Sequence, residues 1–257
     1  MSSSHLLYIL ASYLICKLAP SLFNKEMKEI IKDNLCKDCA VKSSTVYNLN
    51  DEELEILCNN SIEIQFQKGE RIIKQGTFTQ NIVFIKSGIF KMHLTGPINK
   101  DEILKINKGP IFIGASDVFA NKIHTYSVTA LSDTIACFID YSGYKYLIQN
   151  NGKFALEVIK TLSQGIVTHY QYCVNKMQKQ LTATFAEALI YFSEYIFEND
   201  EFLLPLTRVE FGEYIGATRE TVTKIIHDFT KDKIIEVDGR KIKLINKQML
   251  RMISNAG

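Results

Sequence analysis

Tryptophan is absent from this chain, and proline, glycine and cysteine are sparse, with four, thirteen and six residues in 257. So few glycines and prolines exclude collagen-like and low-complexity proteins. Six cysteines at irregular spacing exclude a disulfide-stapled scaffold, and they predict a protein of the reducing cytoplasm. The hydrophobic fraction of 46% and the charged fraction of 23% are those of an ordinary globular protein with one or two domains.

The chain also lacks a large excess of charge of either sign. Thirty Lys and Arg oppose twenty-eight Asp and Glu, so the formal net charge is +2. This balance neither requires nor excludes a nucleic-acid partner. The C-terminus is mildly basic, because residues 205–257 contain ten Lys and Arg against seven Asp and Glu.

No long hydrophobic run is present. The longest, Leu6 to Cys16, is too short for the ~20 residues that span a bilayer, so we expect no membrane partner. A signal peptide would need a basic segment before this run, and none is there. An alternative is that translation begins at Met27, which would make residues 1–26 an artefact.

The region from Ile62 to Tyr141 has the pattern of short antiparallel strands. Gly, Pro, Asn or Asp residues bound each apolar or alternating run, which predicts a barrel or jelly roll. The expected strands are Ile62 to Phe66, Arg71 to Lys74, Asn81 to Lys86, Ile89 to Leu94, Ile103 to Asn107, Thr125 to Ala130 and Thr134 to Asp140.

From Tyr144 to Phe197 the hydrophobic period becomes helical. A stripe at alternating spacings of three and four is typical of a dimer seam, although a helix packed on its own domain gives the same stripe. Residues 181–184 interrupt this pattern, a second helix is expected at 185–197, and a polar loop follows at 198–201. The stripe consists of Ile159, Leu162, Ile166, His169 and Cys173.

Residues 206–230 have the spacing of a helix-turn-helix. Gly212 provides the small residue where two helices cross, Gly216 tolerates the turn, and Val222 provides the branched apolar residue of the second helix. Thr218 is suited to cap that helix. Val209, Phe211, Ile215, Ile225, Ile226 and Phe229 are expected to form its core.

The first turns of the second helix present polar side chains that suit DNA. In the major groove Arg grips guanine and Glu accepts from cytosine, so base contacts are expected from Arg219, Glu220, Thr223 and Lys224. Asp238-Gly239 predicts a hairpin, which would form a wing. Phosphate contacts are expected from Thr207, Arg208, Thr218, Arg240, Lys241 and Lys243.

The pattern L-T-R-x-E-x-G-x-x-x-G-x-x-R-E-T-V-x-K, from Leu206 to Lys224, resembles the Crp/Fnr superfamily of bacterial transcription regulators. Lys68-Gly69-Glu70, Gln75-Gly76 and Phe84 to Gly88 independently resemble the motifs of its cyclic-nucleotide-binding-like domain. The resemblance covers residues 36–246. It implies a homodimer that binds an inverted repeat in double-stranded DNA, with TGTGA-like half-sites, and that acts with RNA polymerase.

The resemblance also implies an α+β fold with an N-terminal antiparallel β-roll (a cyclic-nucleotide-binding-like jelly roll), a long dimerisation helix and a C-terminal winged helix-turn-helix. We expect an N-terminal extension with the CxxC pair over residues 1–45 and the sensory β-roll over 46–152. The dimerisation helix would cover 153–180 and the DNA-binding domain 181–257.

The effector pocket implied by the resemblance contains Gly114, Ala115, His124 and Thr125. In the cAMP-binding branch a glutamate binds the ribose and an arginine binds the cyclic phosphate. Ala115 replaces that glutamate and His124 replaces that arginine, so cAMP binding is not expected. The sequence favours a surface position for His124, and another ligand held by His124 and Thr125 is the alternative.

Three other sensors remain open. The oxygen-sensing branch holds a 4Fe–4S cluster with four cysteines, which Cys36, Cys39, Cys137 (at the end of a late strand) and Cys58 would have to supply. Cys36 and Cys39 are also candidates for thiol redox sensing. His169 and Cys173, four residues apart on one helix face, are candidates for haem.

Other functions have less support. The chain has no Ser-His-Asp, HExxH or P-loop motif, so we do not expect an enzyme. The alternative function is a cyclic-nucleotide-binding-like regulatory module that acts on a protein partner without DNA, against which the winged helix argues.

Overall fold

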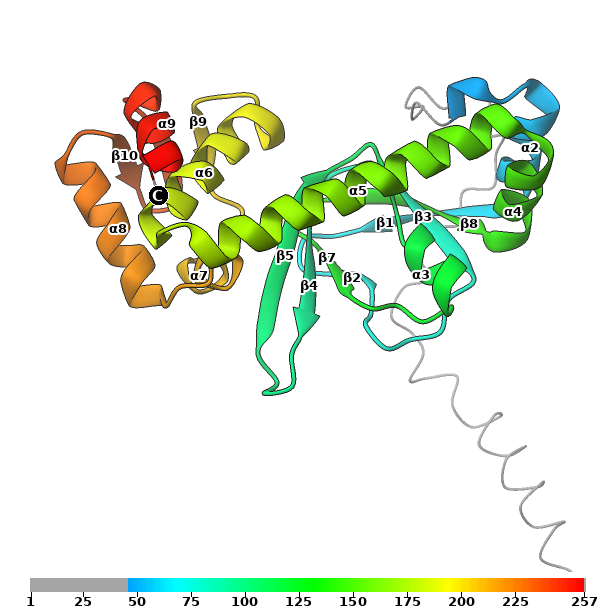
Figure 1. Cartoon of the computed structure of the whole chain (residues 1–257), viewed down its shortest axis with the longest axis horizontal. Helices are drawn as coiled ribbons and strands as arrows, with labels where there is room; N and C mark the ends of the chain where they lie inside the picture. Colours follow the sequence, from blue (N-terminus) through cyan, green and yellow to red (C-terminus); the bar gives the residue numbers. More distant parts are fainter. Residues whose placement is uncertain (1–45, 257) are drawn as a thin grey trace, which may run out of the picture. The chain divides into compact units, whose positions relative to one another are not determined.

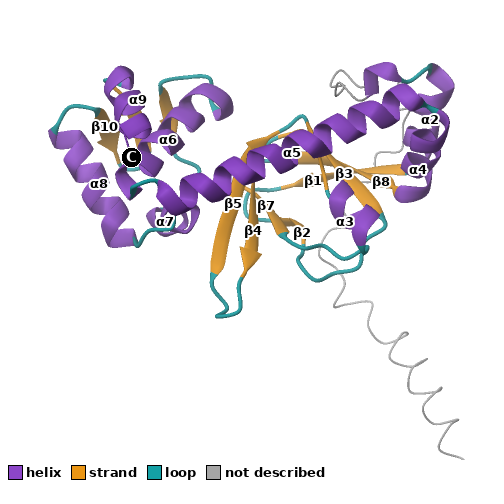
Figure 2. Cartoon of the chain, viewed as in Figure 1, coloured by secondary structure: helices purple, strands orange, loops and turns teal. Residues whose placement is uncertain are grey.

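The computed structural model describes residues 46–256, which Figure 1 colours from blue to red along the sequence. Strands dominate up to Asp140 and helices dominate after it, as Figure 2 shows. The first part contains η1 (Val46–Asn48), α2 (Asp51–Asn59), β1 (Ser61–Phe66), β2 (Arg71–Ile73), β3 (Asn81–Ser87), β4 (Ile89–Thr95), β5 (Asp101–Lys108), β6 (Ile111–Ile113), α3 (Ala115–Ala120), β7 (Ser127–Ala130) and β8 (Thr134–Asp140).

These eight strands form two antiparallel four-stranded sheets. The strand orders are β1-β8-β3-β6 and β2-β7-β4-β5. Side chains of both sheets share one buried cluster, to which β3 contributes Val83 and Ile85 and β4 contributes Phe90. The strands thus form the predicted jelly roll.

Strand β3 is buried on both faces, and this explains why its sequence is a continuous apolar run. Val83 and Ile85 face the second sheet. Ile82 and Phe84 point the other way, because side chains alternate along a strand, and they pack with α2 and the helices after the β-roll. A one-sided strand would instead alternate apolar and polar residues.

The long helix α5 (Gly152–Gln178) has 27 residues and follows α4 (Tyr141–Asn150). Its start is fixed by Asn151, whose side chain accepts a hydrogen bond from the backbone of Phe154 at 3.0 Å. At the start of α2, Asn50 caps the helix, and Glu53 closes the capping box.

Two sequence expectations about element bounds were wrong, and two short elements were missed. The helical break lies at Lys179 and Gln180, whose backbones are extended, and residues 181–184 form the first turn of α6 (Leu181–Tyr191). The loop expected at 198–201 runs into a strand, β9 (Glu201–Leu203). The pattern also missed β6 and α3, which are only three and six residues long.

The C-terminal part is a winged helix. After α6 come the π-helical turn η2 (Phe192–Ile196), β9, α7 (Arg208–Ile215), α8 (Arg219–Lys231), β10 (Ile235–Asp238), β11 (Lys241–Leu244) and α9 (Lys247–Ala256). The strands form a small antiparallel sheet in the order β10-β11-β9. Together with the β-roll and the long helix, this completes the predicted α+β architecture.

Two sequence questions concern the N-terminus and the membrane. None of the helices between residues 46 and 256 combines the length and the apolar character needed to cross a bilayer. The 1–45 extension, the start at Met27, and both Cys36 and Cys39 lie outside the described residues.

Candidate nucleic-acid interface and effector pocket

Helix α7 begins at a capping box. The hydroxyl of Thr207 accepts a hydrogen bond from the backbone of Glu210 at 3.2 Å, and the Glu210 carboxylate accepts one from the backbone of Thr207 at 2.8 Å. The Thr207 hydroxyl also donates to this carboxylate at 2.8 Å. Both side chains therefore fix the start of the helix. Thr207 reaches a phosphate only if its hydroxyl leaves this arrangement or its backbone makes the contact.

Two glycines set the crossing of α7 and α8. A Cβ atom on Gly212 would lie 2.5 Å from the backbone oxygen of Ala217, so only glycine fits where the two helices approach. Gly216 ends α7 with φ of +76°, a conformation that glycine adopts without strain. Their spacing in the sequence therefore has a steric cause.

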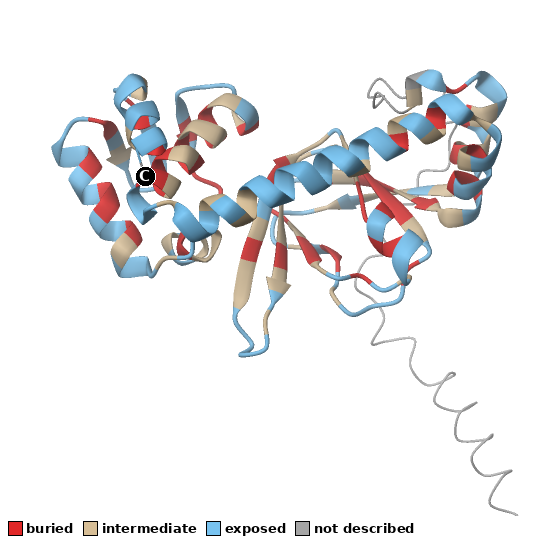
Figure 3. Ribbon diagram, viewed as in Figure 1, coloured by how far each residue is buried: buried red, intermediate tan, exposed pale blue. Residues whose placement is uncertain are grey.

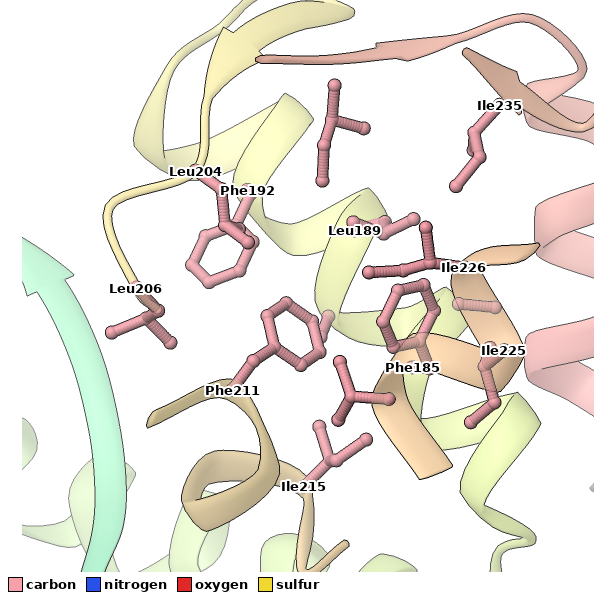
Figure 4. Close-up of a cluster of buried hydrophobic side chains, with 14 of the residues drawn as sticks. Phe185, Leu189, Phe192, Leu204, Leu206, Phe211, Ile215, Ile225, Ile226 and Ile235 are labelled. Atoms are coloured by element: carbon pink, nitrogen blue, oxygen red, sulfur yellow. The ribbon is translucent and has the colours of Figure 1, made fainter. Parts of the chain in front are cut away.

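Helix α8 is held against the domain by one apolar face. Thr218 caps it by accepting a hydrogen bond from the backbone of Thr221 at 3.2 Å. Figure 4 shows Ile225 and Ile226 of α8 in one cluster with Phe211 and other side chains of α6 and α7. Val222 and Phe229 complete the buried face of the helix.

The opposite face of α8 carries the residues expected to contact bases. Arg219, Glu220, Thr223 and Lys224 are all exposed. The Thr223 hydroxyl is already engaged, since it donates to the backbone oxygen of Arg219 at 2.9 Å and accepts from the Arg208 guanidinium at 3.3 Å. Arg219, Glu220 and Lys224 are thus the exposed residues at the start of the helix whose long side chains can extend to a base.

The expected wing is present as the hairpin of β10 and β11, with Gly239 in its turn at φ of +59°. The Arg240 guanidinium donates two hydrogen bonds, at 2.9 and 3.2 Å, to the backbone oxygen of Leu204. Lys241 pairs with Glu201, and Lys243 lies 3.5 Å from Glu236. Exposed pairs of this kind stabilise a protein by about 0–1 kcal/mol, so a phosphate competes with them readily.

The expected effector pocket lies at the start of α3. Gly114 has φ of +81°, and its N–H donates to the Tyr126 hydroxyl at 3.0 Å. Ala115 is buried directly after it. His124 is 7% exposed, which corrects its interpretation as a surface histidine.

The polar groups expected to line the effector pocket are organised by Asp117, which our sequence analysis did not single out. Its carboxylate is buried and accepts hydrogen bonds from the Thr125 hydroxyl at 2.8 Å, the Thr125 backbone at 3.3 Å and His124 Nδ1 at 3.4 Å. Burial alone would raise the pKa of Asp117, but these hydrogen bonds outweigh it and hold the pKa below its ordinary value. A buried carboxylate anion therefore lies beside His124 and Thr125.

The two residues that match the phosphate-binding pair of the family, His124 and Thr125, thus already bind an anion of the chain itself. An incoming phosphate would meet the charge of the buried Asp117, with the imidazole of His124 where the cAMP-binding branch has a guanidinium. Asp117 lies only seven residues before His124 in the sequence, but no sequence motif indicates that the two side chains interact.

The three cysteines within the described residues lie on three different elements. Cys137 lies in the middle of β8, not at its end as expected, and its Sγ donates to Glu63 at 3.7 Å. Cys58 lies in α2 and Cys173 in α5. Between residues 46 and 256 no group of three or more His, Cys, Asp or Glu side chains is placed to hold a metal ion.

The β-roll contacts the winged helix through polar groups and through the buried Ile103, Ile106 and Leu131, which join the hydrophobic cluster of the winged helix. Lys91 of β4 forms an ion pair with Glu210 of α7 at 2.8 Å, and both side chains are largely buried. Burial alone would raise the pKa of Glu210, but its bonds to Lys91 and Thr207 outweigh that effect and lower it. Tyr191 of α6 donates to the backbone oxygen of Ile106 at 2.8 Å, and its burial raises its pKa to about 12.

Comparison with known families identifies both halves of the chain. A model described as a cyclic nucleotide-binding domain matches residues 63–151, and one described as a Crp-like helix-turn-helix domain matches residues 185–253. The first match covers the β-roll and α4. The second covers most of the winged helix, including all four residues expected to contact bases.

Similar proteins extend over nearly the whole chain. Electron transport regulator A of Shewanella oneidensis is 25% identical over 226 residues, which are 85% of this chain and 90% of that protein. The fumarate and nitrate reduction regulatory protein of Yersinia pestis is 26% identical over 227 residues, with the same coverage. A regulator of the crp/fnr family from Eubacterium rectale shares the fold, with a TM-score of 0.69 at 17% identity over 82% of this chain and 97% of that one.

Proposed function

Since the chain belongs to the Crp/Fnr superfamily and is a DNA-binding transcription regulator of that type, we propose that two copies read an inverted repeat with Arg219 and Glu220. The observation that carries this proposal is the placement of both side chains, exposed at the first turn of α8 and opposite its buried face. Arg219 would grip guanine O6 and N7, and Glu220 would accept from the cytosine amino group.

The surrounding residues would position the domain on the DNA more than they would discriminate between bases. Lys224 continues the exposed face of α8 and would contact an outer base of each half-site. Phosphate contacts are proposed from the wing and from the helix starts, and they orient the domain without reading sequence. Thr207, Arg208, Thr218, Arg240, Lys241 and Lys243 are the candidates.

A homodimer is proposed through α5, the helix that joins the β-roll over 46–152 to the winged helix over 181–257. Ile159, Ile166 and Tyr170 are more than half exposed on α5, and such an apolar line favours a second helix as its partner. RNA polymerase as a partner and a cytoplasmic location are proposed from the family alone.

The signal is proposed to be something other than a cyclic nucleotide. The Asp117 carboxylate already occupies His124 and Thr125, and this supports an effector without a phosphate at that position. A redox, gas or uncharged small-molecule signal remains compatible with the pocket and with the cysteines. Catalytic activity forms no part of the proposal.

The test is fluorescence anisotropy with a labelled duplex that contains two TGTGA-like half-sites one helical turn apart. Each bidentate arginine contributes about 1–3 kcal/mol of base discrimination, so Arg219→Ala should cost a dimer about 2–6 kcal/mol. That corresponds to a loss of about 30-fold to more than 10⁴-fold in specific affinity. Binding to a scrambled duplex should persist and should remain sensitive to salt.

Arg251→Ala is the matched control, because it removes the same charge from α9, where Arg251 is exposed and pairs with Glu194 at 2.6 Å. It should leave specific binding within a few-fold of the wild-type value. Equal losses on specific and scrambled DNA in Arg219→Ala, or equal effects of the two variants, would contradict the assignment.

A further inference from the structure

His169 and Cys173 form a pair of metal-binding side chains that the DNA-reading function does not use. They lie one helical turn apart on α5, and Cys173 Sγ is 3.5 Å from His169 Nε2. His169 is exposed and Cys173 is half-buried, so solvent reaches the pair. Figure 3 shows the middle of α5 in pale blue, which marks it as an exposed part of the helix.

The separation of these two atoms matches a tetrahedral zinc site. Zinc binds thiolate sulfur at about 2.3 Å and imidazole nitrogen at about 2.0–2.1 Å. At a tetrahedral angle these two bond lengths place the sulfur and the nitrogen about 3.5 Å apart. The distance is therefore that of two adjacent ligands of one Zn²⁺ ion, and without metal it is spanned by a hydrogen bond between the thiol and the imidazole.

We propose that two such pairs, one from each protomer, bind a single Zn²⁺ ion between the α5 helices as a Cys₂His₂ site. One chain supplies only two of the four ligands, His169 and Cys173. On binding, each Cys173 thiol loses its proton to solvent as the zinc–sulfur bond forms, and His169 binds as the neutral imidazole. The inference rests on the proposed homodimer.

The line of exposed residues on α5 puts Cys173 at the expected seam. Ile159, Ile166 and Cys173 follow one another at intervals of seven residues, so they share one line along the helix. Ile159 is 58% exposed and Ile166 is 52% exposed, and a partner helix would cover both. His169 adjoins this line, three residues after Ile166 and four before Cys173.

Two winged helices that bind neighbouring half-sites of one duplex lie on the same side of the dimer, an arrangement that two α5 helices running in the same direction provide. The two-fold axis then runs along them, and in such an interface each residue lies opposite its own copy. Two thiolates and two imidazoles thus meet across the axis. Zinc is the metal that tetrahedral sulfur and nitrogen ligands favour.

The test measures metal bound to the purified full-length chain. After incubation with zinc chloride and removal of free metal, we expect one zinc per two chains in the wild type. Cobalt substitution should give the intense visible absorption of a tetrahedral thiolate site. Cys173→Ser and His169→Ala, which change exposed or half-exposed side chains, should each abolish both signals.

The Cys36→Ser/Cys39→Ser double variant is the matched control, because it removes two thiols and leaves the α5 pair intact. It should retain one zinc per two chains. The inference is overturned if zinc is lost only in this control, if Cys173 forms a disulfide between protomers and the chain takes up no zinc, or if the pair binds haem with a Soret band. If the wild type takes up no zinc after incubation and still binds the operator specifically, the inference is wrong and the proposed function stands.

Discussion

The substitution Gly212→Ala tests the helix crossing on which the DNA-reading surface depends. Its new methyl carbon would lie 2.5 Å from the backbone oxygen of Ala217, about 1 Å inside the ~3.5 Å at which nonbonded atoms attract. The obstructing atom belongs to the backbone, so no side-chain rotation relieves the clash. Overpacking at such a site costs up to about 3 kcal/mol.

Alanine also has the better helix propensity, by about 1 kcal/mol. The free energy of unfolding should therefore fall by about 2 kcal/mol, the difference between the overpacking and the propensity terms. For a chain of this size that lowers the melting temperature by about 4–8 °C. Because the clash pushes α7 away from α8, specific DNA affinity should fall as well, although no residue expected to contact DNA is altered.

Gly165→Ala is the matched control. Gly165 lies in the interior of α5, and a Cβ there would meet nothing within 4 Å, so the propensity gain should appear alone. Differential scanning calorimetry should show Gly165→Ala melting about 2–4 °C above the wild type. If the two variants melt at the same temperature, or if Gly212→Ala binds the operator like the wild type, the close crossing of α7 and α8 is wrong.

Further predictions concern Asp117 and the contact between the β-roll and α7. Calorimetric titration with cAMP should give no heat of binding, and a tight complex would refute our account of the pocket. The pKa of Asp117 is lowered, so its ionised form stabilises the folded state at pH values above the ordinary pKa of 3.8. This stabilisation is lost as the pH falls below 3.8. The difference in the free energy of unfolding between the wild type and Asp117→Asn should therefore become smaller as the pH is lowered below 3.8. A double-mutant cycle of Lys91→Met and Glu210→Gln should show a coupling of about 1 kcal/mol in urea unfolding, whereas additive losses would mean that the ion pair contributes nothing.

Much of the fold could be predicted because local patterns and tertiary demands agree. The glycines at 212 and 216 are required by a close approach and by a left-handed turn, and both requirements leave a mark in the sequence. The wing could be predicted from Asp238-Gly239 for the same reason. The strands of the β-roll could be predicted because glycine or proline bounds their apolar runs.

The features that were missed depend on contacts distant in sequence or on very short elements. Asp117 reads as an ordinary surface acid until the fold brings Thr125 and His124 to its carboxylate. The hydrophobic stripe on α5 also has two environments, which its periodicity does not reveal. Leu162 packs against the β-roll core, whereas Ile159 and Ile166 are exposed. The helix break moved because Thr184 is compatible with a first helical turn, where its hydroxyl donates to the backbone oxygen of Gln180 at 3.2 Å.

Glu210 connects the β-roll to α7, because its carboxylate forms hydrogen bonds with groups of both at once. One oxygen closes the capping box of α7 with Thr207, and the other accepts from Lys91 of β4. If β4 moved, it would leave a largely buried carboxylate without its charged partner, a cost that α7 could avoid only by moving with the strand. Since α7 and α8 are in close contact at Gly212, a movement of α7 would also move α8 and rotate its face that carries Arg219. We therefore expect a signal in the β-roll to reach DNA through this pair, in addition to the helix break at Lys179 and Gln180.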